Sequence, residues 1–103
     1  MHVFQRQSRT AAMPVIDIHR THAGSIASTK TAIERVAKGI SAHYGVVHQW
    51  IGDELHFTRS GVKGRITVAS KDVHVRVDLG VLMGAMKPII EREISRQLDE
   101  HLV

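Results

Sequence analysis

The sequence contains no cysteine among its 103 residues, which excludes disulfide bonds and thiolate metal sites. It is also poor in aromatic residues, with one Trp, one Tyr and two Phe, so stacking surfaces for nucleic-acid bases are scarce. The longest nearly uncharged apolar stretch runs from Leu79 to Met86, far short of the ~20 residues that a membrane-spanning helix needs. We therefore expect a cytoplasmic protein without a membrane span.

The first 13 residues are polar and basic, without a sustained hydrophobic period. They also lack the apolar core of a signal peptide. We predict a disordered N-terminal arm over residues 1–13 and a single domain over residues 14–103, which is an ordinary domain length. Because Met13 directly precedes Pro14, a translation start at Met13 is an alternative to Met1.

The net charge of +4 and the sequence pI of about 10.0 suggest a nucleic-acid partner. Two of these charges, Arg6 and Arg9, belong to the N-terminal arm. Residues 14–103 hold 12 Lys and Arg against 10 Asp and Glu, a net charge of +2. The domain itself therefore has a mixed surface rather than a strongly basic one.

Hydrophobic periodicity predicts a strand, a helix and then a run of hairpins. Residues 14–20 alternate apolar and polar side chains, as in a half-buried strand. A helix is predicted over Ser25–His43, with Ser25 as its N-cap candidate and Ser28 as the alternative. Gly45 is its expected stop, and a close packing partner is expected at Gly39. Its apolar stripe consists of Ile26, Ile33, Val36, Ala37 and Ile40.

The middle of the sequence has the signature of an antiparallel sheet. Gly52-Asp53 is a two-residue turn signal in a hairpin over residues 46–59, which would place Trp50 opposite Leu55 and His48 opposite Phe57. We read residues 60–64 as the next turn, residues 65–69 as a short strand and residues 73–79 as the clearest strand in the chain.

The C-terminal segment is predicted to be helical. Four aliphatic residues recur at four-residue steps, and Pro88 suits the first turn of this helix. Pro88 also disfavours helical geometry at Lys87, so Val81–Met86 is predicted as a separate helical turn or as a kinked lead-in to this helix. The fold class is α+β, in the order β-α-β-β-β-β-α, with about five antiparallel strands and two helices packed on one face. The four aliphatic residues are Ile90, Ile94, Leu98 and Leu102.

The sequence contains eight histidines, which raises the question of whether the protein binds a metal ion. His19, His56 and His74 fall on the predicted solvent face of the sheet and would suit zinc or copper if their strands were adjacent. The order of the strands is not readable from the sequence, and scattered surface histidines are the alternative. We therefore predict no metal site and no cofactor. His48 is expected to be a partly buried, hydrogen-bonded histidine.

No catalytic centre is recognisable in the sequence. Ser60-Gly61 lacks the strand–elbow–helix context of a hydrolase nucleophile. Gly61 to Gly64 holds glycines and a lysine but joins two strands, unlike a phosphate-binding loop. Asp53-Glu54 falls in a hairpin turn, where carboxylates ordinarily carry solvent-exposed charge and do not act as a catalytic acid and base. We predict no catalytic residues and expect a protein that is not an enzyme.

Two groups of residues are candidates for binding. Arg59, Lys63 and Arg65 cluster around one turn, where they could bind an anion, or could simply keep a sheet edge soluble. The segment from Val81 to Ile90 is apolar around its axis instead of along one stripe. Its large side chains are expected to contact an apolar partner or surface, with the open end of the sheet as the alternative location; they are Leu82, Met83, Met86 and Ile90.

Several runs of the sequence together resemble one bacterial family, the polyhydroxyalkanoic acid system proteins, also described as polyhydroxyalkanoate granule regulatory proteins. The resemblance covers about residues 15–103 and excludes the N-terminal arm. It implies a role in bacterial polyester storage but supplies no catalytic or binding residues. The runs that carry it are Ile18-His19-Arg20-Thr21-His22, Tyr44-Gly45, Trp50 to Phe57, Arg59 to Gly64, Val77 to Gly80 and Lys87 to Glu91.

We therefore expect a non-enzymatic accessory or regulatory protein of the polyester granule. Its partner would be the granule surface, a granule-associated protein, a second copy of the chain or a small apolar ligand. The alternative is a small basic regulatory protein that binds nucleic acid. Salt separates the two, because nucleic-acid affinity falls steeply with ionic strength and apolar contact does not.

Overall fold

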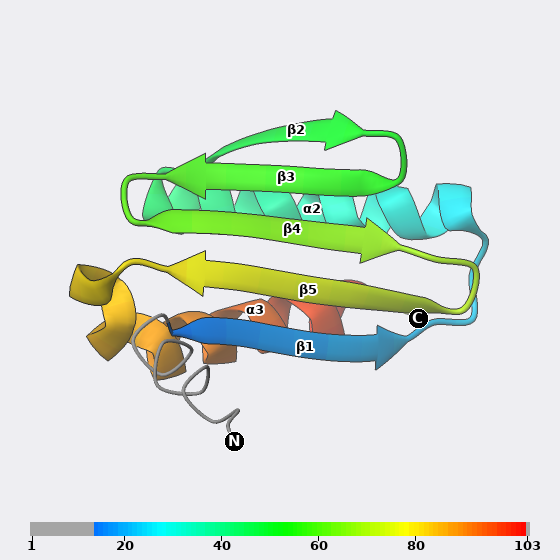
Figure 1. The fold of residues 1–103 in the computed structure, drawn as a ribbon. Coiled ribbons are helices and arrows are strands. Elements are labelled where there is room, and N and C mark those ends of the chain that lie inside the picture. The colour runs from blue at the N-terminus through cyan, green and yellow to red at the C-terminus, as the bar shows by residue number, and fades with distance from the viewer. Residues whose placement is uncertain (1–13, 103) are drawn as a thin grey trace, which may run out of the picture.

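The computed structural model describes residues 14–102 and shows one sheet backed by helices (Figure 1). The predicted order β-α-β-β-β-β-α is confirmed, and the arm predicted for residues 1–13 lies outside the described residues. The elements are β1 (Val15–Thr21), α2 (Ile26–Tyr44), β2 (Val47–Ile51), β3 (Glu54–Arg59), β4 (Val62–Val68), β5 (Asp72–Leu79), the 3₁₀ helix η1 (Val81–Met86) and α3 (Lys87–His101).

The five strands form one antiparallel sheet in the order β1-β5-β4-β3-β2. Strands β2 to β5 are joined by hairpins, whereas β1 pairs with β5 across a long interval of sequence, with Ile16 opposite Val77. This pairing places the first strand at one edge of the sheet and β2 at the other (Figure 1). The polar residues of β1 and β5 therefore become neighbours.

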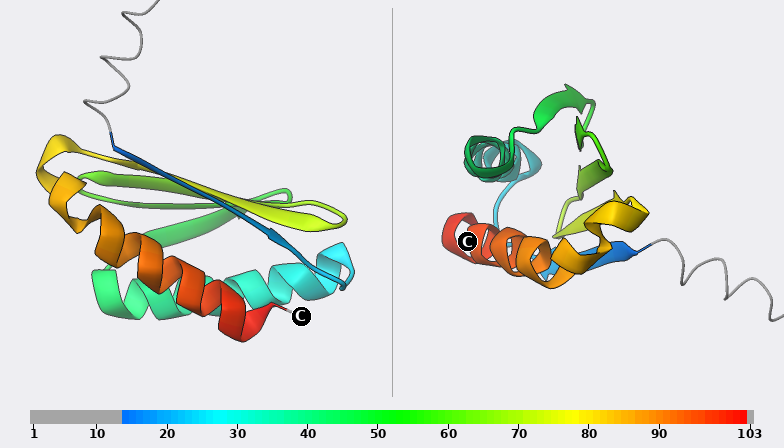
Figure 2. Two further views of the ribbon diagram at one scale, coloured as in Figure 1. Left: turned by 90° about the horizontal axis from the view of Figure 1, so that it is seen from below. Right: turned by 90° about the vertical axis from the view of Figure 1, so that its left-hand side faces the viewer.

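Both helices cover the same face of the sheet, and the opposite face is open (Figure 2). The inward residues of the strands and the apolar stripes of α2 and α3 form one core. Burial of these side chains supplies the main stabilisation of the domain. The largest fully buried side chains are Ile16, Ile33, Leu55, Ile66, Leu79, Ile94 and Leu98.

Helix α2 begins and ends as its sequence predicts. The side chain of Ser25 accepts a hydrogen bond from the backbone N–H of Ser28, and Gly45 ends the helix in the left-handed conformation at φ 67°. Gln97 of α3 packs against the helix at Gly39, where a Cβ would meet its amide at 2.9 Å. Ile26 was expected in the buried stripe but is 36% exposed. Side chains lean toward the N-terminus of a helix, so a first-turn residue points past the packed region.

The first hairpin matches the prediction, with His48 opposite Phe57 and Trp50 opposite Leu55. The prediction for the next turn is wrong, because β4 begins at Val62 and not at Arg65. Gly61 takes φ 81°, a conformation that favours glycine, and closes a two-residue loop. Residues 62–64 therefore belong to the sheet.

The 3₁₀ helix η1 spans Val81–Met86, as predicted for a separate helical turn. Pro88 lies in the first turn of α3. The expectation that Pro88 would keep Lys87 out of helical geometry is wrong, since Lys87 has φ −51° and ψ −50°. The preference is a steric bias that surrounding packing can override. Within residues 14–102, no helix is long and apolar enough to cross a membrane.

Candidate functional site: an exposed apolar corner

The corner where β5 passes into η1 and α3 exposes large aliphatic side chains. Leu82 is 95% exposed, Val81 is 72% exposed and Ile89 is 47% exposed. Lys87 is the one charged residue between Gly80 and Ile90. Single exposed aliphatic residues are normal on a protein surface. Three exposed aliphatic residues within one short, nearly uncharged segment form a candidate contact surface. We call this surface the apolar corner (Val81, Leu82 and Ile89).

The structure separates the four residues that were predicted to contact a partner. Leu82 is almost fully exposed, whereas Met83 and Met86 are half-buried and pack against the core. Ile90 is only 7% exposed and belongs to the core. Ile90 is therefore not available to a partner, because the period of α3 turns it toward the sheet. Val81 and Ile89 were not among the predicted contacts, although both belong to the same apolar segment.

Backbone hydrogen bonds hold the apolar corner to the sheet. The N–H of Gly80 donates to the carbonyl of Gly61 at 2.8 Å, and the N–H of Met83 donates to the carbonyl of Gly80 at 2.9 Å. The side chain of Met83 packs against Gly61, where a Cβ would meet its Cγ at 2.9 Å. Because Met83 points inward, the preceding residue, Leu82, points to solvent.

A small apolar cavity lies behind Met83, between the helices and the sheet. Its lining includes Tyr44, Phe57 and Ile90, with Arg59 at the edge. Its volume is about 20 Å³, room for about one water molecule. Pockets for small organic ligands measure roughly 300–1,000 Å³, so an apolar ligand would have to displace Met83 and η1.

The three basic residues predicted to form an anion site point to different faces. Arg59 lies on the helix side, where its Nη1 donates to the carbonyl of Tyr44 at 2.7 Å. This bond satisfies a carbonyl at the C-terminus of α2. Lys63 and Arg65, on β4, are exposed on the open face. Lys63 and Arg65 therefore share the open face, whereas Arg59 and Lys63 line a separate hollow of about 430 Å³ beside Gly61.

A further basic residue, Arg76, joins them on the open face. Arg76 is the direct partner of Arg65 across β4 and β5. Together with His56, Lys63 and Asp78 they line a shallow hollow of about 160 Å³. Like charges opposite one another destabilise a sheet, so a bound anion would relieve this pair. The even spacing of strand β5 places Arg76 on this face, but its proximity to Arg65 follows only from the strand pairing.

A serine, a histidine and a glutamate form a row on the helix side. His48 Nδ1 lies 3.4 Å from Ser41 Oγ, and His48 Nε2 lies 3.1 Å from Glu34 Oε2. Trp50 Nε1 donates to the other Glu34 oxygen at 2.8 Å. This hydrogen bond, followed by the hydrogen bond and the electrostatic interaction with His48, lowers the pKa of Glu34 below its ordinary value of 4.5.

This row has the residue types of a nucleophilic centre but a different setting. Ser41 lies in the last turn of α2, where the surrounding backbone N–H groups are used within the helix. The row instead ties the edge strand β2 to α2. It also confirms the expectation that His48 is partly buried and hydrogen-bonded.

Of the three histidines considered for the solvent face of the sheet, the structure brings two together. His19 and His74 are direct partners on β1 and β5. His56 lies on the same face but on β3, beyond β4, and its Nε2 contacts Glu54 at 3.1 Å. The group near His19 and His74 is completed by Asp17 instead of His56. The sequence did not show that β1 pairs with β5, and this pairing makes His19 and His74 neighbours.

Comparisons with known proteins give one match. The model of the family described as "Putative polyhydroxyalkanoic acid system protein" (PHA_gran_rgn) matches residues 16–102. No curated protein and no solved structure matched the chain. The matched range spans β1 to the end of α3 and contains the apolar corner. The chain belongs to the PHA_gran_rgn family of polyhydroxyalkanoic acid system proteins.

Proposed function

We propose that the protein is a non-enzymatic accessory protein of the polyhydroxyalkanoate granule and that the apolar corner contacts the polyester surface directly. The observation that carries this proposal is the exposure of Leu82, at 95%, beside Val81, at 72%. Family membership supports the choice of partner, because the family is described as belonging to the polyhydroxyalkanoic acid system. The granule would lie in the cytoplasm, where the protein is proposed to act.

The energetics favour such a contact. Burial of apolar surface stabilises a complex by about 25 cal/mol per Å², and the corner presents its aliphatic side chains with one charge, Lys87, among residues 80–90. Few polar groups would therefore lose water on contact. The corner projects from the end of the sheet where β5 passes into η1 (Figure 1).

The same geometry supports surface contact over a soluble ligand. The interior cavity holds about 20 Å³, while a hydroxyalkanoate-sized ligand would need several times that space. Contact with the corner requires no rearrangement, since η1 already has no buried residue. A granule-associated protein or a second copy of the chain would also bury the corner, and the experiment separates these partners.

The test is co-sedimentation with protein-stripped polyester granules at low and high salt. The wild type is compared with a double variant of the corner, Val81→Ser with Leu82→Ser. The matched control is Val47→Ser with Ile51→Ser, which removes two aliphatic side chains that are 73% and 58% exposed on β2. Thermal unfolding establishes that each variant is folded.

We expect salt-resistant binding by the wild type and the control, and at least a tenfold loss for the corner variant, which is about 1.4 kcal/mol. Binding only to native, protein-coated granules would show a protein partner and overturn direct contact. Loss of wild-type binding at high salt would assign the interaction to charged residues and support the nucleic-acid or acidic-partner alternative. A corner-dependent dimer in sedimentation experiments, without granule binding, would also overturn the proposal.

A further inference from the structure

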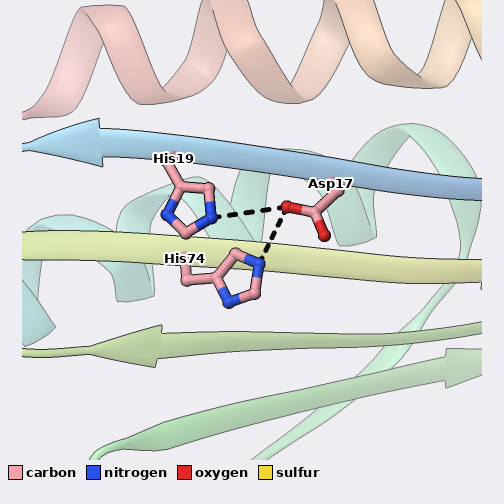
Figure 3. A group of neighbouring side chains, drawn as sticks. All are labelled: Asp17, His19 and His74. Atoms are coloured by element: carbon pink, nitrogen blue, oxygen red, sulfur yellow. Dashed lines mark hydrogen bonds and ion pairs between the residues drawn. The ribbon is translucent and has the colours of Figure 1, made fainter.

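Two histidines meet on the open face of the sheet, at the β1 edge. His19 and His74 are opposite partners in the register of β1 and β5. Opposite residues of an antiparallel pair have Cβ atoms about 4.5–5.5 Å apart on the same face. Asp17 precedes His19 by two residues and therefore projects from the same face of β1. Three side chains with metal-binding atoms thus converge at one place (Figure 3).

The distances among the three groups are short. His74 Nε2 lies 2.9 Å from Asp17 Oδ1, and His19 Nε2 lies 3.5 Å from the same oxygen. One nitrogen from each histidine and one carboxylate oxygen all lie within 4.8 Å of one another. A metal ion bound at about 2.0–2.2 Å from nitrogen and oxygen atoms holds its ligands at separations of this order.

We propose that Asp17, His19 and His74 form a binding site for a divalent transition-metal ion such as Zn²⁺. The ligands would be the Nε2 atoms of both histidines and one oxygen of Asp17. Imidazole and carboxylate groups suit zinc and its neighbours in the transition series. Three protein ligands leave at least one coordination position for water or for a group of another molecule.

The two imidazole rings must turn to bind one ion. They now stack, with centroids 4.1 Å apart and planes 8° from parallel. A metal ion lies close to the plane of each imidazole that binds it, so parallel rings cannot both direct Nε2 at one ion. The side chains of His19 and His74 are 66% and 35% exposed. This exposure leaves room for rotation about the Cβ–Cγ bonds, and metal binding should therefore break the stack.

The surroundings leave the carboxylate of Asp17 directed at the histidines. Arg76 is the backbone partner of Asp17, yet its Nη2 contacts Asp78 at 3.5 Å. Other described histidines are differently engaged. Both ring nitrogens of His22 contact protein groups, as do both of His48. Within residues 14–102, this is the group in which two histidines and a carboxylate share one place.

His56 provides the matched control on the same face. Its Nε2 contacts Glu54 at 3.1 Å, and its side chain is 37% exposed, close to the 35% of His74. It therefore offers a histidine and a carboxylate without a second histidine beside them. If Zn²⁺ bound only weakly and non-specifically to the surface, replacing His56 would weaken binding as much as replacing His74. If the proposed site binds Zn²⁺, only the replacement of His74 weakens binding.

The experiment is calorimetric titration of the untagged full-length protein with ZnCl₂ at about pH 7.5, where imidazole is mostly neutral. We expect one saturable site that His19→Asn and His74→Asn each weaken at least about tenfold, since even outer-shell changes commonly cost 10–100-fold. His56→Asn should bind as the wild type does. NMR should show Zn²⁺ shifting the ring signals of His19 and His74 first. Equal binding by His74→Asn and His56→Asn, or the absence of saturable binding, would overturn the proposal.

Discussion

The ring of Phe57 occupies the space that a side chain at Gly64 would need. The two residues are direct partners on β3 and β4, and a Cβ atom at Gly64 would overlap the ring. Phe57 is only 3% exposed, so its ring is held between the sheet and the helices. Glycine in a strand interior is ordinarily unfavourable. Here it gives the largest side chain of β3 a place in the core.

Replacement of Gly64 by alanine is expected to destabilise the protein. Overpacking of a core costs about 1–3 kcal/mol, and the displaced group is a buried ring, so we expect about 2 kcal/mol or more. Urea unfolding measures this loss. Gly80→Ala is the control, because a Cβ at Gly80 meets Gly61 at an ordinary 3.5 Å. In a Phe57→Leu background the cost of Gly64→Ala should shrink; an unchanged cost would contradict the packing described.

Glu34 should contribute to the pH dependence of stability. Its folded-state pKa is lowered, first by the hydrogen bond from Trp50 and then by His48. A lowered pKa means that the ionised group stabilises the fold above the ordinary pKa of 4.5 and loses this contribution as the pH falls through the folded value. The free energy of unfolding of the wild type should therefore fall more steeply below about pH 4.5 than that of Glu34→Gln.

The variant Trp50→Phe tests whether the hydrogen bond from Trp50 lowers the pKa of Glu34. Phenylalanine keeps most of the ring but removes the Nε1–H that donates to Glu34 at 2.8 Å. We expect the pKa of Glu34, followed by carboxyl NMR, to rise in this variant. A pKa that stays unchanged would show that the hydrogen bond is not the main cause. Lys30 lies over the ring of Trp50, 4.9 Å from its centroid, and this contact should survive in phenylalanine.

His22 joins β1, α2 and the β4–β5 turn. It is 9% exposed; its Nε2 lies 2.8 Å from the carbonyl oxygen of Ala69, and its Nδ1 lies 3.0 Å from Thr29 Oγ1. Thr29→Val keeps the shape of the side chain but leaves Nδ1 without this partner. We expect a loss of about 1–3 kcal/mol, the cost of an unsatisfied buried polar group. Thr31→Val, on the exposed side of the same helix, should change stability by less than about 0.5 kcal/mol.

Leu82 and Ile90 should respond oppositely to truncation, although the sequence groups them in one apolar segment. Leu82→Ala should change the free energy of unfolding by less than about 0.5 kcal/mol, because the side chain is 95% exposed. Ile90→Ala should cost about 2–5 kcal/mol, as for other buried aliphatic residues. Thermal or urea unfolding measures both. Comparable losses at the two positions would mean that η1 is packed differently.

Local patterns predicted most of the elements, because their causes are local. Period-two alternation indicated the strands, and the Gly52-Asp53 turn set the register that places His48 opposite Phe57. The caps at Ser25 and Gly45 act within a few residues. The prediction for the turn after Arg59 was wrong, because a two-residue loop with Gly61 at φ 81° closes this hairpin. Lys63 therefore belongs to the sheet. Two glycines within residues 60–64 resembled a longer loop.

Which distant residues become neighbours depends on the tertiary structure. The sequence was enough to predict the antiparallel α+β class, the register of the first hairpin and the family. Pairing of β1 with β5 brought Asp17 and His19 to His74 and left His56 apart. The orientation of η1 and α3 separated exposed Leu82 from buried Ile90. Such contacts depend on how helices and an edge strand close around a shared core, a long-range property that no local periodicity contains.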